Sequence, residues 1–530
     1  MGILGTRNWV AKVFAFSLSL CGCINTKAAG VTLITHGLNG NADGWVQAMA
    51  NAIADYSLRT EGAALFRLEF YESAGYWHVR SRKLGGGDPL KVPGGEIVVT
   101  LDWRQLAAGG KTYNTYQVAS VVAPALVAPN TVPELGGHAL AELPLHLIGH
   151  SRGGSVVCEL SRLLGTEGVW VDHVTTLDAH PLNNDGFEDA SLYTAIDAPA
   201  RIYENVLWGD SYYQDSNWFV FGEPVMGAFW RMQTDLTGGY VDFLTGSHSD
   251  IHLWYHGTID LNTPATDSEA WITASERNAW WTESEQYGYN VGFFYSLLGG
   301  GDRKSLTQPN GAYSSTVRSG FNQRWDLGAG LVNNRTSLAV NSGEWPNPIL
   351  LNVTTTNVVH YGDTSTLSVA YQWAQPVTQA LTVGVYADDD LNPYNGNERL
   401  LESGTTSGTT ASQVGQGTID VIWSPTNALP GTRALFLKLS AAGKARYLYA
   451  PEFVEVLPPE PPRLEIHAKS QGGVVVAVNG TAGQTIVLEA STDLAVWESF
   501  ATNTLNSSRW ETSLPPIGIG QKAFIRAMAR

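Results

Sequence analysis

The sequence predicts an α/β domain with a mostly parallel sheet, followed by a β-sandwich and a small all-β module. Between residues 31 and 206, short β-branched runs alternate with segments of helical periodicity, which is the pattern of βαβ units. After Trp345 the helical pattern gives way to short alternating strands separated by Gly, Thr, Asn and Ser turns. A chain of 530 residues is also too long for one compact core.

The composition divides the chain into five segments. They are a signal segment (1–29), the α/β domain (30–345), an immunoglobulin- or fibronectin-like β-sandwich (346–457), a proline-rich linker (458–462) and the C-terminal β-module (463–530). Because the sandwich has its own β pattern, we expect the α/β domain to fold without the segments that follow it.

The first segment indicates export. Arg7 and Lys12 precede a short apolar stretch, residues 13–20, which is too short to span a bilayer. Cleavage near residue 29 releases a secreted protein, whereas cleavage before Cys23 leaves a lipid-anchored one. The expected location is therefore outside the cell or on its surface.

The overall charge excludes one class of partner. The formal net charge is -17, and the resulting field repels phosphate backbones. We therefore expect no nucleic-acid partner and a substrate that is neutral.

The α/β elements follow from the periodicity. The expected strands are Val31–Thr35, Ala64–Phe70, Glu96–Leu101, Leu145–Ile148, His173–Leu177 and Arg201–Val206. Helical stripes are expected near residues 46–56, over 118–122 ahead of the breaker Pro124, and over 156–164. The aromatic-rich residues 208–247 show neither period and are expected to leave the sheet as a lid or pocket wall, and residues 262–300 are expected to be helical.

One motif carries nucleophilic chemistry. Gly149-His150-Ser151-Arg152-Gly153 lies between a predicted buried strand and a predicted helix. A strand, small residues where the backbones meet, and a helix are what a nucleophile elbow requires, so Ser151 is the candidate nucleophile. The backbone N–H of Arg152 is then one expected oxyanion donor, and Leu38 in the loop after the first strand is the other. His36 is interpreted as a side chain that orients this loop.

With a later Asp and His, these motifs resemble the lipase and esterase branch of the α/β-hydrolase superfamily over residues 30–300. The resemblance implies ester substrates and a Ser, Asp, His order along the chain. Asp178, at the end of the strand after the elbow helix, is the expected acid. His248 is the expected base because His248-Ser249-Asp250-Ile251 is similar to a His-x-Asp loop of bacterial lipases, and His252 is the alternative.

The sequence also contains two patterns that are typical of metal ligands. His248 and His252 have the i, i+4 spacing of zinc ligands, but no further ligand motif accompanies them, so catalysis is expected to need no metal or other cofactor. In the sandwich, oxygen-bearing side chains at alternate positions suit a structural Ca²⁺: Asp388, Asp390, Asn392 and Glu398. The other interpretation of that segment is an Asn-Gly hairpin.

The sequence therefore predicts a serine hydrolase that cleaves apolar esters or lipids. The same triad also suits an amidase, a thioesterase or a phospholipase, and a non-catalytic adhesin is the alternative outside enzymes. The C-terminal β-modules are expected to matter for insoluble or surface-bound substrate.

Overall fold

A computed structural model describes residues 29–529 with internal gaps. The gaps are 58–62, 108–112, 185–192, 215–221, 234–235, 241–245, 261, 264–269, 271, 282–291, 299–306, 309–310, 313–334, 342, 356, 361–362, 375–378, 408–413, 426–429, 452, 459–460, 469–472, 482 and 515–522. The predicted signal segment and Cys23 lie outside the described residues. Within the part of the chain that is described, no helix is both long and apolar enough to cross a membrane.

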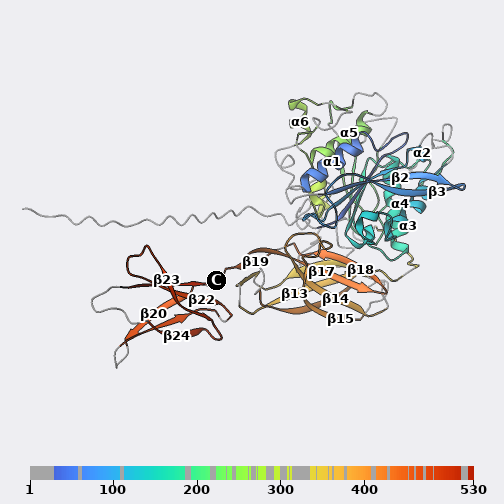
Figure 1. Ribbon diagram of the computed structural model, residues 1–530. Helices are drawn as coiled ribbons and strands as arrows, with labels where there is room; N and C mark the ends of the chain where they lie inside the picture. Colours follow the sequence, from blue (N-terminus) through green and yellow to red (C-terminus); the bar gives the residue numbers. More distant parts are fainter. Residues whose placement is uncertain are drawn as a thin grey trace, which may run out of the picture.

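The N-terminal unit is built on an eight-stranded sheet with the order β3-β2-β4-β1-β5-β6-β7-β8 (Figure 1). Its strands are β1 (Val31–Thr35), β2 (Ala64–Ser73), β3 (Tyr76–Gly86), β4 (Ile97–Asp102), β5 (Leu145–His150), β6 (Val171–Leu177), β7 (Val206–Tyr213) and β8 (Phe229–Met232). Pairing is antiparallel between β2 and β3 and parallel from β2 through β8, which confirms the mostly parallel sheet.

Helices cover both faces of this sheet because its buried strands are apolar on both sides. The helices are α1 (Trp45–Ser57), α2 (Arg104–Ala107), α3 (Thr115–Val127), α4 (Arg152–Thr166), α5 (Gly246–Gly257) and α6 (Ala274–Trp280), with short 3₁₀ turns at Pro133–Leu135, Leu140–Glu142 and Gly292–Tyr295. Leu33 and Leu147 pack with the α3 and α4 side chains, whereas Ile34 and Ile148 pack with those of α1 and α5.

Several boundaries differ from the sequence-based expectation. The strand expected at Arg201–Val206 instead begins at Val206, and α3 continues through Pro124 to Val127. The aromatic segment is not an excursion throughout, because Trp208 lies in β7 and Phe229 in β8, both buried. Their aromatic and β-branched neighbours give these runs strand propensity that a search for strict alternation misses. Of residues 262–300, the described helical parts are α6 and the turn at Gly292–Tyr295.

The C-terminal region is all β. The sandwich contains one sheet with the order β11-β13-β16 and a second with the order β12-β19-β17-β14-β15, with β18 paired to β17. Its strands are β11 (Asn347–Val353), β12 (Val358–His360), β13 (Ser365–Ala374), β14 (Leu381–Asp388), β15 (Arg399–Thr406), β16 (Val414–Trp423), β17 (Gly431–Ala441), β18 (Lys444–Tyr449) and β19 (Val454–Leu457). A two-residue pair, β9 (Thr307–Gln308) and β10 (Gly311–Ala312), precedes it.

The last module has two three-stranded sheets and a hydrophobic cluster of its own. They are formed by β20 (Arg463–Ala468), β21 (Val474–Asn479) and β24 (Arg509–Ser513), and by β23 (Glu498–Thr504), β22 (Thr485–Ser491) and β25 (Phe524–Ala529).

The sandwich and the α/β unit are packed together, with one hydrophobic cluster that includes residues of both. Arg446 of β18 is 4% exposed and donates hydrogen bonds to the backbone oxygens of Trp170 at 2.8 Å and Leu143 at 3.2 Å. Asn392 donates to the backbone oxygen of Pro89 at 2.8 Å. This shared burial does not support the expectation that the α/β domain folds alone.

Candidate active site

Ser151 occupies a sharp turn between β5 and α4. Its φ is 58° and its ψ is -129°, a conformation that costs a non-glycine residue about 1–3 kcal/mol. Three backbone hydrogen bonds hold the turn: Ser151 N–H donates to Leu177 O at 2.9 Å, and Ser151 O accepts from Gly154 N–H at 2.9 Å and His180 N–H at 3.1 Å. The strain is therefore maintained by the neighbouring strand and helix.

The glycines of the motif are required by close backbone contact. A Cβ at Gly149 would lie 2.1 Å from Gly153 O, and one at Gly153 would lie 2.5 Å from His36 O. A Cβ at Gly37 would lie 2.6 Å from the Ser151 Cβ. The loop after β1 thus packs directly against the serine.

Asp178 and His248 are brought together by the fold. Asp178 follows β6, is fully buried, and its Oδ2 lies 2.6 Å from His248 Nδ1. Gln214 supplies the other partners of the carboxylate, with its backbone N–H on Oδ1 and its side-chain amide on Oδ2, both at 3.0 Å. This arrangement fixes the imidazole with Nδ1 toward the acid, so Nε2 is the nitrogen that can exchange a proton with a substrate or nucleophile. His248 lies inside α5 and not in a loop, contrary to the expectation.

His248 also lies beside the Ser151 turn. Its ring centroid is 4.5 Å from that of His150, and its backbone oxygen accepts a hydrogen bond from His150 Nε2 at 2.9 Å. Within the described residues the Ser151 hydroxyl makes no hydrogen bond to His248. Such bonds are often long in unliganded enzymes and tighten when substrate binds.

His252, the alternative base, lies elsewhere. Its ring stacks on Trp45 with centroids 4.1 Å apart and contacts His150 edge-on at 4.7 Å. Burial holds the pKa of His252 well below its usual range. It is His248 that the structure places against Asp178.

The two expected oxyanion donors are available. Among the described residues, neither the Leu38 N–H nor the Arg152 N–H donates a hydrogen bond. Arg152 directly follows the serine, and Leu38 follows Gly37, which contacts the serine side chain. Two unpaired amides beside a hydroxyl can stabilise the negative oxygen of a tetrahedral intermediate.

His36 orients the loop that contains Leu38. Its ring stacks on Trp103 with centroids 5.3 Å apart, and its Nε2 accepts the Trp103 N–H at 3.2 Å. Nδ1 is then the protonated nitrogen and donates to Gly37 O at 3.0 Å. The interpretation of His36 as an orienting side chain agrees with these contacts.

Asp197 is a residue that the sequence reasoning missed. It accepts two hydrogen bonds from the Arg152 guanidinium, at 2.6 and 2.8 Å, and both side chains are completely buried. One feature of the sequence could have indicated it, because Asp197 is the single charged residue in the apolar run from Ala195 to Ala200. A buried charge needs a partner, and here the partner is the residue after the nucleophile.

The proposed calcium ligands are occupied by different partners. Tyr449 donates to Asp388, and the Asn395 and Asn397 amides donate to Asp390 at 2.7 and 2.8 Å. The other two ligands also have separate partners, with Asn392 bonded to Pro89 O and Glu398 to the Gly396 N–H. Among the described residues, no three His, Cys, Asp or Glu side chains form a group that could hold a metal ion. The segment connects β14 and β15 as a hairpin, with Gly396 at a φ of 86°.

Comparisons with known proteins do not identify a family. No family model matches the chain, and no curated protein matches it. Similar solved structures include a CARDB domain from Pyrococcus furiosus in complex with di-metal ions (13% identity, 22% of this chain and 96% of that one, TM-score 0.15). Others are a cytokine receptor complex (14% identity, 34% and 89%, TM-score 0.14) and the human OSCAR ligand-binding domain (14% identity, 35% and 90%, TM-score 0.14). TM-scores this low do not indicate that these structures share an overall fold with this chain.

Proposed function

We propose that this chain is a serine hydrolase of the α/β-hydrolase type, that it cleaves carboxylic esters, and that Ser151, Asp178 and His248 are its catalytic residues. The observation that supports the proposal is the 2.6 Å contact between Asp178 Oδ2 and His248 Nδ1. It lies at the carboxyl ends of the interior strands β5 and β6, where Ser151 occupies a strained turn. Positive φ angles at two non-glycine residues of the site, Ser151 and Asp178, are typical of functional positions.

The proposed reaction has two stages. The Nε2 of His248 takes the Ser151 proton, the serine oxygen attacks the ester carbonyl, and the Leu38 and Arg152 amides stabilise the oxyanion. The imidazolium then protonates the departing alcohol, which leaves an acyl-serine. Water gives a proton to the same imidazole as it attacks the acyl group, and the acid is released as the serine regains its proton.

Three further parts of the proposal concern the setting of the reaction. We propose that the protein acts outside the cell or on its surface, that the substrate is an apolar ester or lipid, and that the β-modules help it to reach insoluble substrate. Tethering near a surface raises the effective concentration of enzyme there.

The test uses covalent labelling and paired variants. A fluorophosphonate should label the wild-type protein and leave Ser151→Ala unlabelled, with folding compared by circular dichroism. His248→Ala should slow hydrolysis of p-nitrophenyl esters by several decades, and His252→Ala by much less. Labelling of Ser151→Ala would falsify the nucleophile assignment. Amide and thioester analogues in the same panel identify the acyl bond that is cleaved.

A further inference from the structure

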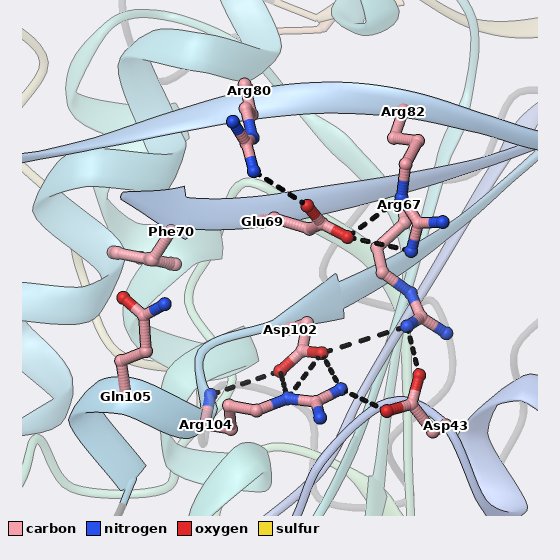
Figure 2. Close-up of a pocket in the computed structure, with 9 residues that line it drawn as sticks. All are labelled: Asp43, Arg67, Glu69, Phe70, Arg80, Arg82, Asp102, Arg104 and Gln105. Carbon is pink, nitrogen blue, oxygen red and sulfur yellow. Dashed lines mark hydrogen bonds and ion pairs between the residues drawn. The ribbon is translucent and has the colours of Figure 1, made fainter. Parts of the chain in front are cut away.

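A charged cavity of about 350 Å³ lies beside the end of β4 and the middle of β2 and β3, next to the loop that contains Leu38. Its volume is within the range of small-molecule sites. Figure 2 shows the side chains around it, which are Asp43, Arg67, Glu69, Phe70, Arg80, Arg82, Asp102, Arg104 and Gln105.

The lining has an excess of positive charge, because it contains four arginines and three carboxylates. Each carboxylate is already paired with arginine: Glu69 lies between Arg80 and Arg82, while Asp43 and Asp102 both contact Arg104. A hydrogen bond from Arg67 is the main cause that holds the pKa of Asp43 below its usual range. All three carboxylates therefore have arginine partners, so the cavity does not favour a cation.

The arginines, in contrast, have unused donors. In the part of the chain that is described, the Nη1 atoms of Arg80, Arg82 and Arg104 donate no hydrogen bond. Arg80 and Arg82 are 65% and 55% exposed, and Arg80 is held over the Tyr71 ring at 5.8 Å. Guanidinium groups with free N–H donors match the oxygens of carboxylates and phosphates.

The cavity is close to the candidate active site. Asp43 belongs to the same loop as Leu38, and its carboxylate fixes that loop to Arg104 at 2.5 Å. Asp102 ends β4, which is separated from β5 only by β1. At roughly 4.8 Å per strand, the Asp102 end of the cavity lies about 10 Å from Ser151, and the backbones of Arg80 and Arg82 on β3 lie about 19 Å from it.

We propose that this cavity binds the carboxylate or phosphate of an ester substrate whose scissile carbonyl lies at Ser151, about 19 Å from the backbones of Arg80 and Arg82. The assignment to substrate rests on the proposed function, whereas anion binding itself does not. The preferred ester then carries an anionic group at its far end as well as an apolar chain.

The first experiment measures anion binding to the full chain without any hydrolysis. Inorganic phosphate and acetate are titrated by calorimetry in a buffer of low ionic strength. Arg80→Gln and Arg82→Gln should each weaken phosphate binding about tenfold. Glu69→Gln should tighten it, because it releases both guanidiniums. Arg399→Gln, on the exposed β15, is the control for net charge and should have no effect. No phosphate binding by the wild type, or equal weakening by Arg399→Gln, overturns the site.

The second experiment decides whether the anion belongs to the substrate. It compares p-nitrophenyl half-esters of dicarboxylic acids of rising length with neutral esters of equal length. A long half-ester should be preferred over the neutral ester of equal length. Arg82→Gln should raise the KM for the half-ester about tenfold with little change in kcat, and it should leave the KM and kcat for the neutral ester nearly unchanged. Phosphate binding without any preference among the esters would keep the site and overturn its assignment to substrate. If no ester is hydrolysed while phosphate still binds, the proposed function fails and the anion site remains.

Discussion

Arg152 and Asp197 form an ion pair in which both side chains are completely inaccessible to solvent. Asp197 also accepts the N–H groups of Thr115 and Leu182, both at 3.0 Å, so one carboxylate joins three segments of the chain. Because Arg152 follows Ser151, this pair positions an amide of the proposed oxyanion site.

Removing one partner of this pair should be costly. Asp197→Ala leaves a buried guanidinium without its acid, and we expect a loss of about 3–5 kcal/mol in the free energy of unfolding. Urea denaturation measures it. The double variant Arg152→Met/Asp197→Leu should recover most of the loss, and a double variant as unstable as the single one would contradict this account of the pair.

Ser151→Gly should be more stable than Ser151→Ala. Glycine adopts the φ of 58° without strain, whereas alanine keeps the strain of the serine. After allowance for the greater unfolded-state entropy of glycine, the difference should be about 1 kcal/mol. Thermal unfolding of the two variants gives the answer, and equal stability would mean that the turn is not strained.

Gly149→Ala should destabilise the chain by about 4 kcal/mol or more, since its Cβ would lie 2.1 Å from Gly153 O. Gly85→Ala is the matched control, because a Cβ there meets no heavy atom within 4 Å. Denaturant midpoints of both variants provide the comparison, and similar midpoints would show that the backbones at the elbow can separate.

Stability should depend on pH through Glu96. Burial raises the pKa of this carboxyl from 4.5 to about 8, against a hydrogen bond from Thr32. Between pH 4.5 and about 8 the folded state therefore keeps a proton on Glu96 that the unfolded chain has lost. As the pH rises through this interval, the free energy of unfolding decreases, because keeping the proton becomes more costly. Glu96→Gln should gain stability relative to wild type over that interval. Denaturation curves of both proteins at roughly pH 5, 7 and 9 test this. If the free energies of unfolding of Glu96→Gln and wild type differ by the same amount at all three pH values, Glu96 is not the cause.

The local elements around the site were predictable because each depends on a short pattern. Gly149 and Gly153 mark a strand-to-helix turn, and the β-branched run up to Leu177 marks a strand that ends just before Asp178. The choice of His248 used a His-x-Asp pattern, yet Asp250 accepts the Tyr240 N–H at 2.8 Å and is not its partner. The pattern thus indicated His248, although the acid that contacts His248 is Asp178 and not Asp250.

Other features could not be read from the sequence because they depend on distant residues. Asp210 is one example: it is buried in β7 and accepts hydrogen bonds from His173 at 2.9 Å and Tyr212 at 3.0 Å. The pairing of Arg152 with Asp197 likewise depends on where separate loops meet. Charge in a sequence suggests exposure, and only the packing shows which charges are partnered inside.

The buried position of Arg446 makes the sandwich a permanent partner of the α/β unit and not a removable accessory. A calorimetric scan of the full chain should give one melting peak for both units and a separate peak for the C-terminal module, whose hydrophobic cluster is its own. A protease that nicks the chain near residue 345 should leave the two fragments associated under native conditions. Exchange of the region that follows this α/β unit is therefore restricted to domains that can supply an arginine to the backbone oxygens of Leu143 and Trp170.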